Sequence, residues 1–408
     1  MTKTDGGFWS LPLLGLLVGR ISATLTNSIL AVAVGWHLYQ ATGNAFDLAL
    51  VGLFQVSPIL ALFLLTGWVA DNFSRRNILV ASAALQIVVA IAVAIVMNQA
   101  EFNKWFLYIA LLFSGVARAF FSPAIQSALV NIVNPAHLNR AIALNSVCWN
   151  AALIVGPFVA GLLVALLDTQ LYWGLVLLGG FTILGFSVLP ALKICNRKTI
   201  SLDDLLGGIR YLKANQNVFG CMMLDLLIVL FGSVMAILPM FVSDVMQEGP
   251  EILGLLRAMP ALGATIIGLY LTRSSGQFRQ TGKVLFRALT VFACSILLFS
   301  VSTTTIVAAF ALFVYGGSDM FSVVIRSSIV QLLTPDNLRG RVSALNGIFI
   351  ASSNELGDFR SGSAAALLGP VYGVLLGGFM ALGVVWGGRL WFRSLSELQE
   401  IQPDNVTK

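Results

Sequence analysis

Long apolar runs of about 20 residues follow one another along this chain and are joined by short turns that carry most of its charge. A helix of that length crosses the roughly 30 Å hydrocarbon core of a bilayer. Of the 408 residues, 58% are hydrophobic and only 10% are charged, which is more apolar surface than a soluble fold of this size can bury. The pattern therefore predicts an all-α membrane protein.

Twelve such spans can be placed along the sequence. The first six cover roughly 11–37, 48–70, 77–97, 105–130, 141–167 and 171–192, and the second six roughly 218–243, 251–272, 283–301, 303–331, 341–368 and 371–392. The run that begins at Leu11 is too long for the apolar core of a signal peptide, so it is taken as the first span.

Basic residues set the predicted orientation. Most of the 24 Lys and Arg fall in turns and tails on one side of the spans, and only Lys104 lies in a turn on the other side. Because cytoplasmic loops accumulate Lys and Arg, we predict that both termini are cytoplasmic. This topology accounts for the basic balance, and we expect no nucleic acid partner.

Residues that usually carry metal or nucleophilic chemistry are few and scattered. His37 and His137 stand alone, and no Walker loop, HExxH motif or nucleophile elbow occurs. The cysteines show no CxxC spacing and are interpreted as apolar core residues: Cys148, Cys195, Cys221 and Cys294. We therefore expect no enzyme, no metal site and no cofactor.

The two halves of the chain repeat one another. Segment 134–140 matches segment 334–341, and downstream of them Gly156 falls on Gly357. A further alignment of Ser28-x-x-Ala31 with Ser233-x-x-Ala236 places Arg20 on Asp225, so equivalent positions carry opposite charges. This opposition motivates the hypothesis that Arg20 and Asp225 form an inner gate.

The repeat predicts two six-helix halves, 1–192 and 218–408, with a cytoplasmic linker, 193–217, between them. Leucines at helical spacing in the linker favour an amphipathic helix on the inner membrane surface. Two halves of parallel topology predict a transporter body with its substrate site where they meet.

A charged turn separates the second and third spans, and its key residues are Gly67, Asp71, Arg75 and Arg76. It resembles the loop between the second and third helices of the major facilitator superfamily, whose pattern is Gly-x-x-x-Asp-Arg-x-Gly-Arg-Arg. Asn72 and Ser74 depart from that pattern. The position at a cytoplasmic helix end predicts that this turn controls conformational switching.

With the repeat, the resemblance covers nearly the whole chain. Segment 115–124 is similar to the fourth helix of the drug and siderophore exporter branch, and segment 339–347 to the start of the eleventh helix in bacterial enterobactin-exporter-like proteins. Segment 156–161 resembles a Gly-Pro-x-x-Gly-Gly element of antiporters, from which Ala160 departs. Gly156 and Pro157 are either a structural kink or a kink that seals the pathway against ion leak.

Nine ionisable residues fall inside the predicted spans and away from the span ends: Arg20, Arg118, Asp225, Arg257, Asp319, Arg326, Glu355, Asp358 and Arg360. Each would cost about 2.5–3.5 kcal/mol at a helix centre facing lipid, so they must face one another, water or the headgroups. In the family that the chain resembles, the first, fourth, seventh and tenth helices line the central cavity. The resemblance thus places Arg20, Arg118, Asp225, Asp319 and Arg326 there, while structural ion pairing is the alternative for each.

Glu355 and Asp358 are three residues apart and share a helix face. Their repulsion in a low dielectric favours a proton on one of them, or else an arginine that clamps both. The candidate proton carriers are Asp225, Asp319 and Glu355. The candidate anion or gate partners are Arg118 and Arg20.

These observations predict an exporter of a siderophore or drug-like compound in the bacterial inner membrane, working by alternating access and driven by proton entry. Its expected partners are the small-molecule substrate, protons and membrane lipids, and we expect a monomer. An importer or lysophospholipid flippase on the same fold is an alternative. A transport-inactive scaffold or receptor is another, which would predict a soluble domain or a loss of the cavity charges.

Overall fold

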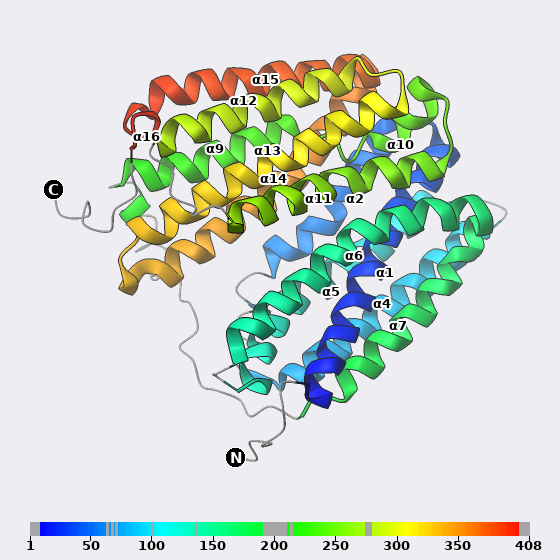
Figure 1. Ribbon diagram of the computed structural model, residues 1–408. Coiled ribbons are helices and arrows are strands. Elements are labelled where there is room, and N and C mark those ends of the chain that lie inside the picture. Colours follow the sequence, from blue (N-terminus) through cyan, green and yellow to red (C-terminus); the bar gives the residue numbers. More distant parts are fainter. Residues whose placement is uncertain are drawn as a thin grey trace. The chain divides into compact units, whose positions relative to one another are not determined.

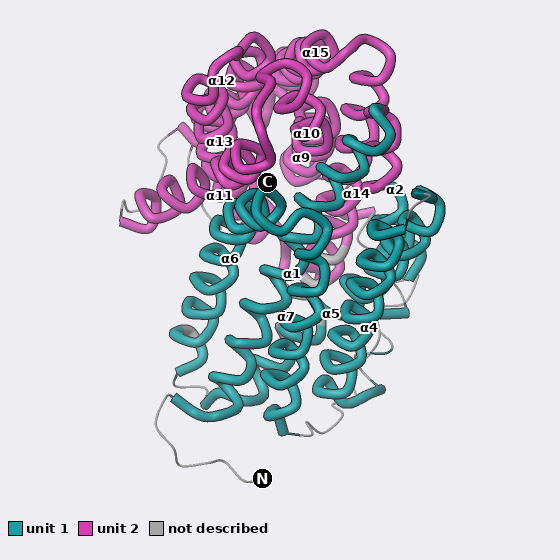
Figure 2. Tube along the Cα trace, turned by 90° about the vertical axis from the view of Figure 1, so that its right-hand side faces the viewer, with its two compact units in different colours: residues 1–43, 53–199 teal, residues 44–52, 200–408 magenta. Residues whose placement is uncertain are grey.

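The computed structural model describes residues 9–62, 65–66, 69, 72–99, 102–134, 137–190, 210–212, 215–273 and 280–399. All regular secondary structure within these ranges is helical (Figure 1). The chain forms two compact units, with 1–43 and 53–199 in unit 1 and 44–52 and 200–408 in unit 2 (Figure 2). Helix α2 (Ala45–Ala61) begins in unit 2 and ends in unit 1.

Unit 1 is a bundle of long helices: α1 (Leu11–Thr42), α4 (Arg75–Met97), α5 (Lys104–Ile132), α6 (Leu138–Leu167) and α7 (Leu171–Ser187), with the short turn η2 (Asp168–Gln170) before α7. Helix α1 packs against α6 and α7, and α4 packs against α5 and α7. Side chains of α1, α5 and α7, among them Leu16, Ile125 and Phe186, form a buried core. Apolar side chains from several of the predicted runs thus pack against one another inside the bundle.

Unit 2 contains α9 (Gln216–Gly232), α10 (Leu238–Met240), the π-helical turn η3 (Phe241–Met246), α11 (Pro250–Arg273), α12 (Thr281–Ser300), α13 (Thr305–Leu333), α14 (Asp336–Leu368), α15 (Pro370–Trp391) and α16 (Arg393–Ser396). Helix α13 packs against α11 and α12, and α9 packs against α14 and α15. These contacts place α9, α13 and α14 around the charged residues described below.

Local chemistry explains several helix ends. The Ser10 hydroxyl accepts from the Leu13 N–H at 3.4 Å and caps the start of α1. Asn103 caps α5 by accepting from the Trp105 N–H at 3.0 Å. Helix α1 ends at Gly43, whose φ of 61° is a left-handed conformation that glycine adopts without strain.

Eight described segments are long and apolar enough to cross a membrane, judged by length and composition. One of them, Arg140–Ser187, contains most of α6 and all of α7. Two shorter apolar helices are α2 and α9, and α14 falls outside this set because polar and charged residues interrupt it. The count of twelve spans stays a prediction.

The span expected over 218–243 is not one continuous helix. Helix α9 ends at Gly232, residues 233–237 are non-helical, and α10 and η3 complete the segment. Pro239 is the local cause, because its nitrogen cannot donate to the carbonyl of Met235 and its ring collides with that carbonyl in a helix. The equivalent part of α1 has no proline and remains helical.

Two glycines at equivalent positions of the repeat make equivalent contacts. A Cβ on Gly156 of α6 would lie 2.6 Å from the Ser28 Cβ of α1. A Cβ on Gly357 of α14 would lie 3.0 Å from the Ser233 Cβ and 2.7 Å from the Val229 carbonyl oxygen. In both units, therefore, a helix approaches its neighbour at a serine with no room for a side chain.

We expect Gly156→Ala and Gly357→Ala each to lower the free energy of unfolding by about 1–3 kcal/mol, because the added methyl group overpacks a close contact with the neighbouring segment. The matched control is Gly383→Ala in α15, where an added Cβ meets no heavy atom within 4 Å. Thermal unfolding of the purified variants in detergent measures the difference. Equal melting temperatures for all three variants would contradict the close packing.

Candidate functional site

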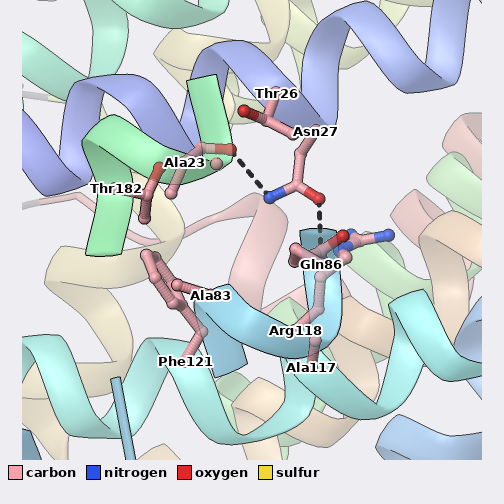
Figure 3. A pocket seen from close by; sticks show the side chains of 10 residues that line it. Ala23, Thr26, Asn27, Ala83, Gln86, Ala117, Arg118, Phe121 and Thr182 are labelled. Carbon is pink, nitrogen blue, oxygen red and sulfur yellow. Dashed lines mark hydrogen bonds between the residues drawn. The ribbon is translucent and has the colours of Figure 1, made fainter. Parts of the chain in front are cut away.

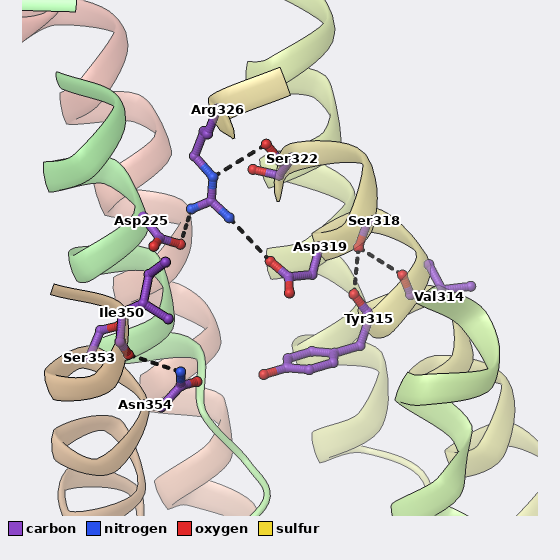
Figure 4. A network of polar contacts seen from close by, with 10 residues as sticks. All are labelled: Asp225, Val314, Tyr315, Ser318, Asp319, Ser322, Arg326, Ile350, Ser353 and Asn354. Atoms are coloured by element: carbon purple, nitrogen blue, oxygen red, sulfur yellow. Dashed lines mark hydrogen bonds and ion pairs between the residues drawn. The ribbon is translucent and has the colours of Figure 1, made fainter. Parts of the chain in front are cut away.

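One ionic group of unit 2 joins Asp225 of α9 to Asp319 and Arg326 of α13 (Figure 4). Arg326 Nη1 donates to Asp225 Oδ1, and Nη2 lies 3.4 Å from Asp319 Oδ1. Arg326 Nε donates to the Ser322 carbonyl at 3.3 Å. Asp319 and Arg326 are seven residues apart, two helical turns, so both side chains lie on the face of α13 that meets α9.

These three side chains differ in exposure. The side chains of Arg326 and Asp225 are 7% and 13% exposed, whereas that of Asp319 is 37% exposed. A guanidinium stays protonated in proteins, so two ionised carboxylates around Arg326 would leave one uncompensated negative charge. Of the two carboxylates, Asp319 makes the longer contact with Arg326 and is the more exposed.

A small cavity of about 30 Å³ adjoins the same group and is lined by Cys221, Asp225, Arg326, Ser327 and Asn346, among others. That volume holds a single water molecule. Two of the lining residues, Asp225 and Arg326, are the tightest pair of the ionic group. A water there would have charged and polar partners, as a proton-conducting water requires.

A second charged cluster lies on α14. Arg257 of α11 interacts electrostatically with Asp358 and Glu355. Asp358 also accepts hydrogen bonds from the Ser233 hydroxyl and the Ala236 N–H. The two alternatives for Glu355 and Asp358, a proton on one of them or an arginine that clamps both, stay predictions.

Polar side chains also line a small cavity inside unit 1 (Figure 3). Arg118 of α5 donates to the Gln55 side chain of α2 at 2.8 Å. Gln86 of α4 donates to Asn27 of α1 at 3.1 Å, and its amide lies 3.4 Å from the Ser114 hydroxyl. A cavity of about 20 Å³ touches Asn27, Gln86 and Arg118.

Among polar side chains inside the spans, the sequence-based prediction named only ionisable residues and missed the amides Asn27, Gln55 and Gln86. Their signal was available, because an amide inside an apolar run must find a hydrogen-bond partner within the protein. The prediction also treated His37 as isolated. His37 lies 2.8 Å from the Tyr172 hydroxyl and 3.0 Å from an Asp168 carboxylate oxygen, so it links the end of α1 to the turn before α7.

Arg20 lies on α1 among aromatic rings. Its guanidinium carbon is 5.4 Å from the Trp149 ring centroid and 5.9 Å from that of Phe121. Among the described residues, Arg20 Nε is buried without a hydrogen-bond partner. Asp225 pairs with Arg326 inside unit 2, and the proposed Arg20–Asp225 gate stays a prediction.

The predicted conformational switch is only partly described. Gly67 and Asp71 lie outside the described residues, as do Cys195 and most of the linker 193–217. Arg75 and Arg76 begin α4, and Arg75 is buried. Pro157 lies within α6, next to the close contact that Gly156 makes with Ser28.

Metal-binding chemistry is not apparent in the part of the chain that the structure describes. No group of three or more His, Cys, Asp or Glu there could hold a metal ion. Cys148, Cys221 and Cys294 are free thiols.

Comparisons with known proteins place these features in a family. The chain matches the family model described as transmembrane secretion effector over residues 15–402. It is 24% identical over 396 residues to the enterobactin exporter EntS of Escherichia coli O1:K1, covering 96% of this chain and 94% of the relative. It is 22% identical over 392 residues to the EntS protein of Salmonella typhimurium, covering 95% of this chain and 93% of the relative.

Solved structures agree on the fold. The nucleoside transporter NupG superposes with a TM-score of 0.71 at 15% identity, over 96% of this chain and all of NupG. A bacterial homologue of the iron transporter ferroportin superposes with a TM-score of 0.67 at 18% identity, over 95% of this chain and 99% of the homologue. The chain is therefore a multi-pass membrane transporter that belongs to the transmembrane secretion effector family of the major facilitator superfamily.

Proposed function

We propose that this protein is a secondary exporter of a small organic molecule in the bacterial inner membrane, with both termini in the cytoplasm. Relatives that cover nearly the whole chain are named as exporters of enterobactin, which is a siderophore. The observation that carries the proposal is the ionic group of Asp225, Asp319 and Arg326, since intramembrane carboxylates of this kind mark ion pathways.

The architecture that we propose has twelve spans in two six-helix halves, 1–192 and 218–408, joined by the linker 193–217. Support comes from the contact of Gly156 with Ser28 in unit 1 and that of Gly357 with Ser233 in unit 2. In the sequence repeat, Gly156 is equivalent to Gly357 and Ser28 is equivalent to Ser233. The eight apolar segments become nine when α6 and α7 are counted separately, and α2, α9 and α14 bring the number to twelve.

Proton entry is the proposed energy source, and Asp319 is the proposed carrier. Arg326 contacts Asp225 and lies 3.4 Å from the more exposed Asp319, and we take Asp319 as the carboxylate that gains and loses a proton. When Asp319 is protonated the group is neutral, and when it is ionised the group carries one negative charge. Such a change in buried charge biases a protein between two conformations.

Unit 1 supplies the proposed cargo contacts. Arg118 adds a positive charge to the amides of Gln55, Gln86 and Asn27, a set that favours a polar cargo with anionic or hydroxyl groups. A siderophore fits this description better than an apolar drug, and both remain cargo classes to test. The flippase and importer alternatives would show as transport of lysophospholipid or as uptake.

We expect cargo flux to depend on an inward proton gradient. Proteoliposomes with the protein and enterobactin or ethidium as probes measure this flux, with empty liposomes as the control. Imposing the gradient should accelerate export of the recognised probe, and collapsing both the pH and voltage gradients should remove the acceleration. A flux unchanged after both gradients are collapsed would rule out proton coupling.

A further inference from the structure

The break in the seventh span exposes backbone oxygens at the end of α9, and one arginine binds them. Arg360 of α14 donates from Nη2 to the Phe231 carbonyl at 2.8 Å and to the Ser233 carbonyl at 3.3 Å. Its Nε donates to the Leu230 carbonyl at 3.2 Å. Carbonyls at a helix C-terminus have no partner within the helix and carry partial negative charge. The guanidinium therefore satisfies three oxygens that the break leaves open.

Asp358 of the same helix binds the donors of the break. It accepts hydrogen bonds from the Ser233 hydroxyl and the Ala236 N–H. Two side chains of α14, two residues apart, thus bind the end of α9 and the non-helical segment after it. Arg360 donates to carbonyl oxygens there, and Asp358 accepts from donor groups of the non-helical segment. Non-helical backbone at membrane depth is tolerated only where such partners are provided.

The space around the guanidinium is closely fitted. A Cβ on Gly377 of α15 would lie 2.7 Å from the Phe231 oxygen and 2.9 Å from Arg360 Nη2. Gly377 lies four residues after Gly373 in α15, and this close contact explains why a glycine stands at position 377. Arg360 Nη1 is buried and has no hydrogen-bond partner among the described residues. The pocket therefore surrounds the charge but does not use all of its donors.

Arg360 is the cation that contacts these carbonyl oxygens. Its removal would leave the Leu230, Phe231 and Ser233 oxygens without this donor and take one positive charge away from Asp358. Carbonyl oxygens of broken membrane helices together with a carboxylate are the ligands that coupling cations take in transporters.

We propose that the break at the end of α9 has the ligands of a monovalent-cation site. The guanidinium of Arg360, which is covalently attached to α14, occupies this site in place of a free ion. The site consists of the Leu230, Phe231 and Ser233 carbonyls, with Asp358 nearby. An arginine cannot dissociate or lose its proton, so the site holds the break in one conformation and binds no free ion. The proposal deepens the proposed function by making Arg360 a positioning residue, and it rests on that function only for the membrane depth of the segment.

The test uses the purified full chain in detergent and needs no transport. Arg360→Ala should melt roughly 5 °C below the wild type in choline chloride, because three carbonyls lose their partner. Sodium, potassium or dilute guanidinium chloride at equal ionic strength should restore part of that loss. The wild type should melt at the same temperature in all four salts.

Two further variants make the result specific. Arg389→Ala removes an exposed arginine that lies over the Phe286 ring, and its melting temperature should not respond to the choice of cation. Arg360→Gln removes the charge but keeps much of the volume, so its melting temperature should depend on the added cation as that of Arg360→Ala does. It replaces the alanine variant if that variant does not fold. If neither Arg360 variant responds to any cation, or if both melt like the wild type, the proposal is overturned. Absence of proton coupling would not change these outcomes, so the two proposals fail separately.

Discussion

Asp319→Asn is expected to reduce proton-driven export to the background of empty liposomes while leaving the protein folded. The reason lies in the charge balance of its group. Asparagine cannot take up a proton, and Arg326 keeps its contact with Asp225, so the variant is held in the electrically neutral state. Export measured with an imposed proton gradient should vanish. Cargo exchange across the membrane without a gradient should persist, because a neutral group still permits the cycle to reverse.

The matched control for this variant is Asp319→Glu, which keeps a titratable carboxyl group and should retain part of the gradient-driven flux. Thermal unfolding checks that both variants are intact. If Asp319→Asn still exports at the wild-type rate under a proton gradient, Asp319 is not the carrier, and Glu355 becomes the next carboxylate to test.

Arg326→Gln is expected to cause the largest loss of stability of any substitution in this group. Removing the guanidinium of Arg326 takes away the countercharge that Asp225 and Asp319 contact in unit 2. Breaking one partner out of a buried ion pair costs about 3–5 kcal/mol. For a chain of this size we expect the melting temperature to fall on the order of 10 °C.

The double variant Asp225→Asn with Arg326→Gln should recover most of that stability, because two amides can hydrogen-bond where the ion pair stood. Arg273→Gln, at the exposed end of α11, is the control and should change the free energy of unfolding by less than about 0.5 kcal/mol. A double variant as unstable as the sum of its single variants would show that the two residues do not interact.

The sequence alone determined the class of the protein and the position of most helices. Apolar runs that must be shielded from water specify where a helix enters and leaves the bilayer, so the predicted span 283–301 differs little from α12 (Thr281–Ser300). The charged turns and the motif around Arg75 and Arg76 were enough to predict the superfamily, which the family match over 15–402 confirms.

Tertiary structure decided which polar groups meet. Hydropathy places a residue at a depth along its helix but leaves free the rotation of that helix and the choice of its neighbours. Nothing in the spacing of Asp225, Asp319 and Arg326 indicates that one arginine contacts both carboxylates, and nothing marks Arg360 as the partner of carbonyls on α9. Pro239 signals a broken helix locally, yet the groups that satisfy the break come from α14, more than a hundred residues away. Such partners follow from the packing of whole helices, because a buried backbone group must be satisfied by whichever element the fold brings beside it.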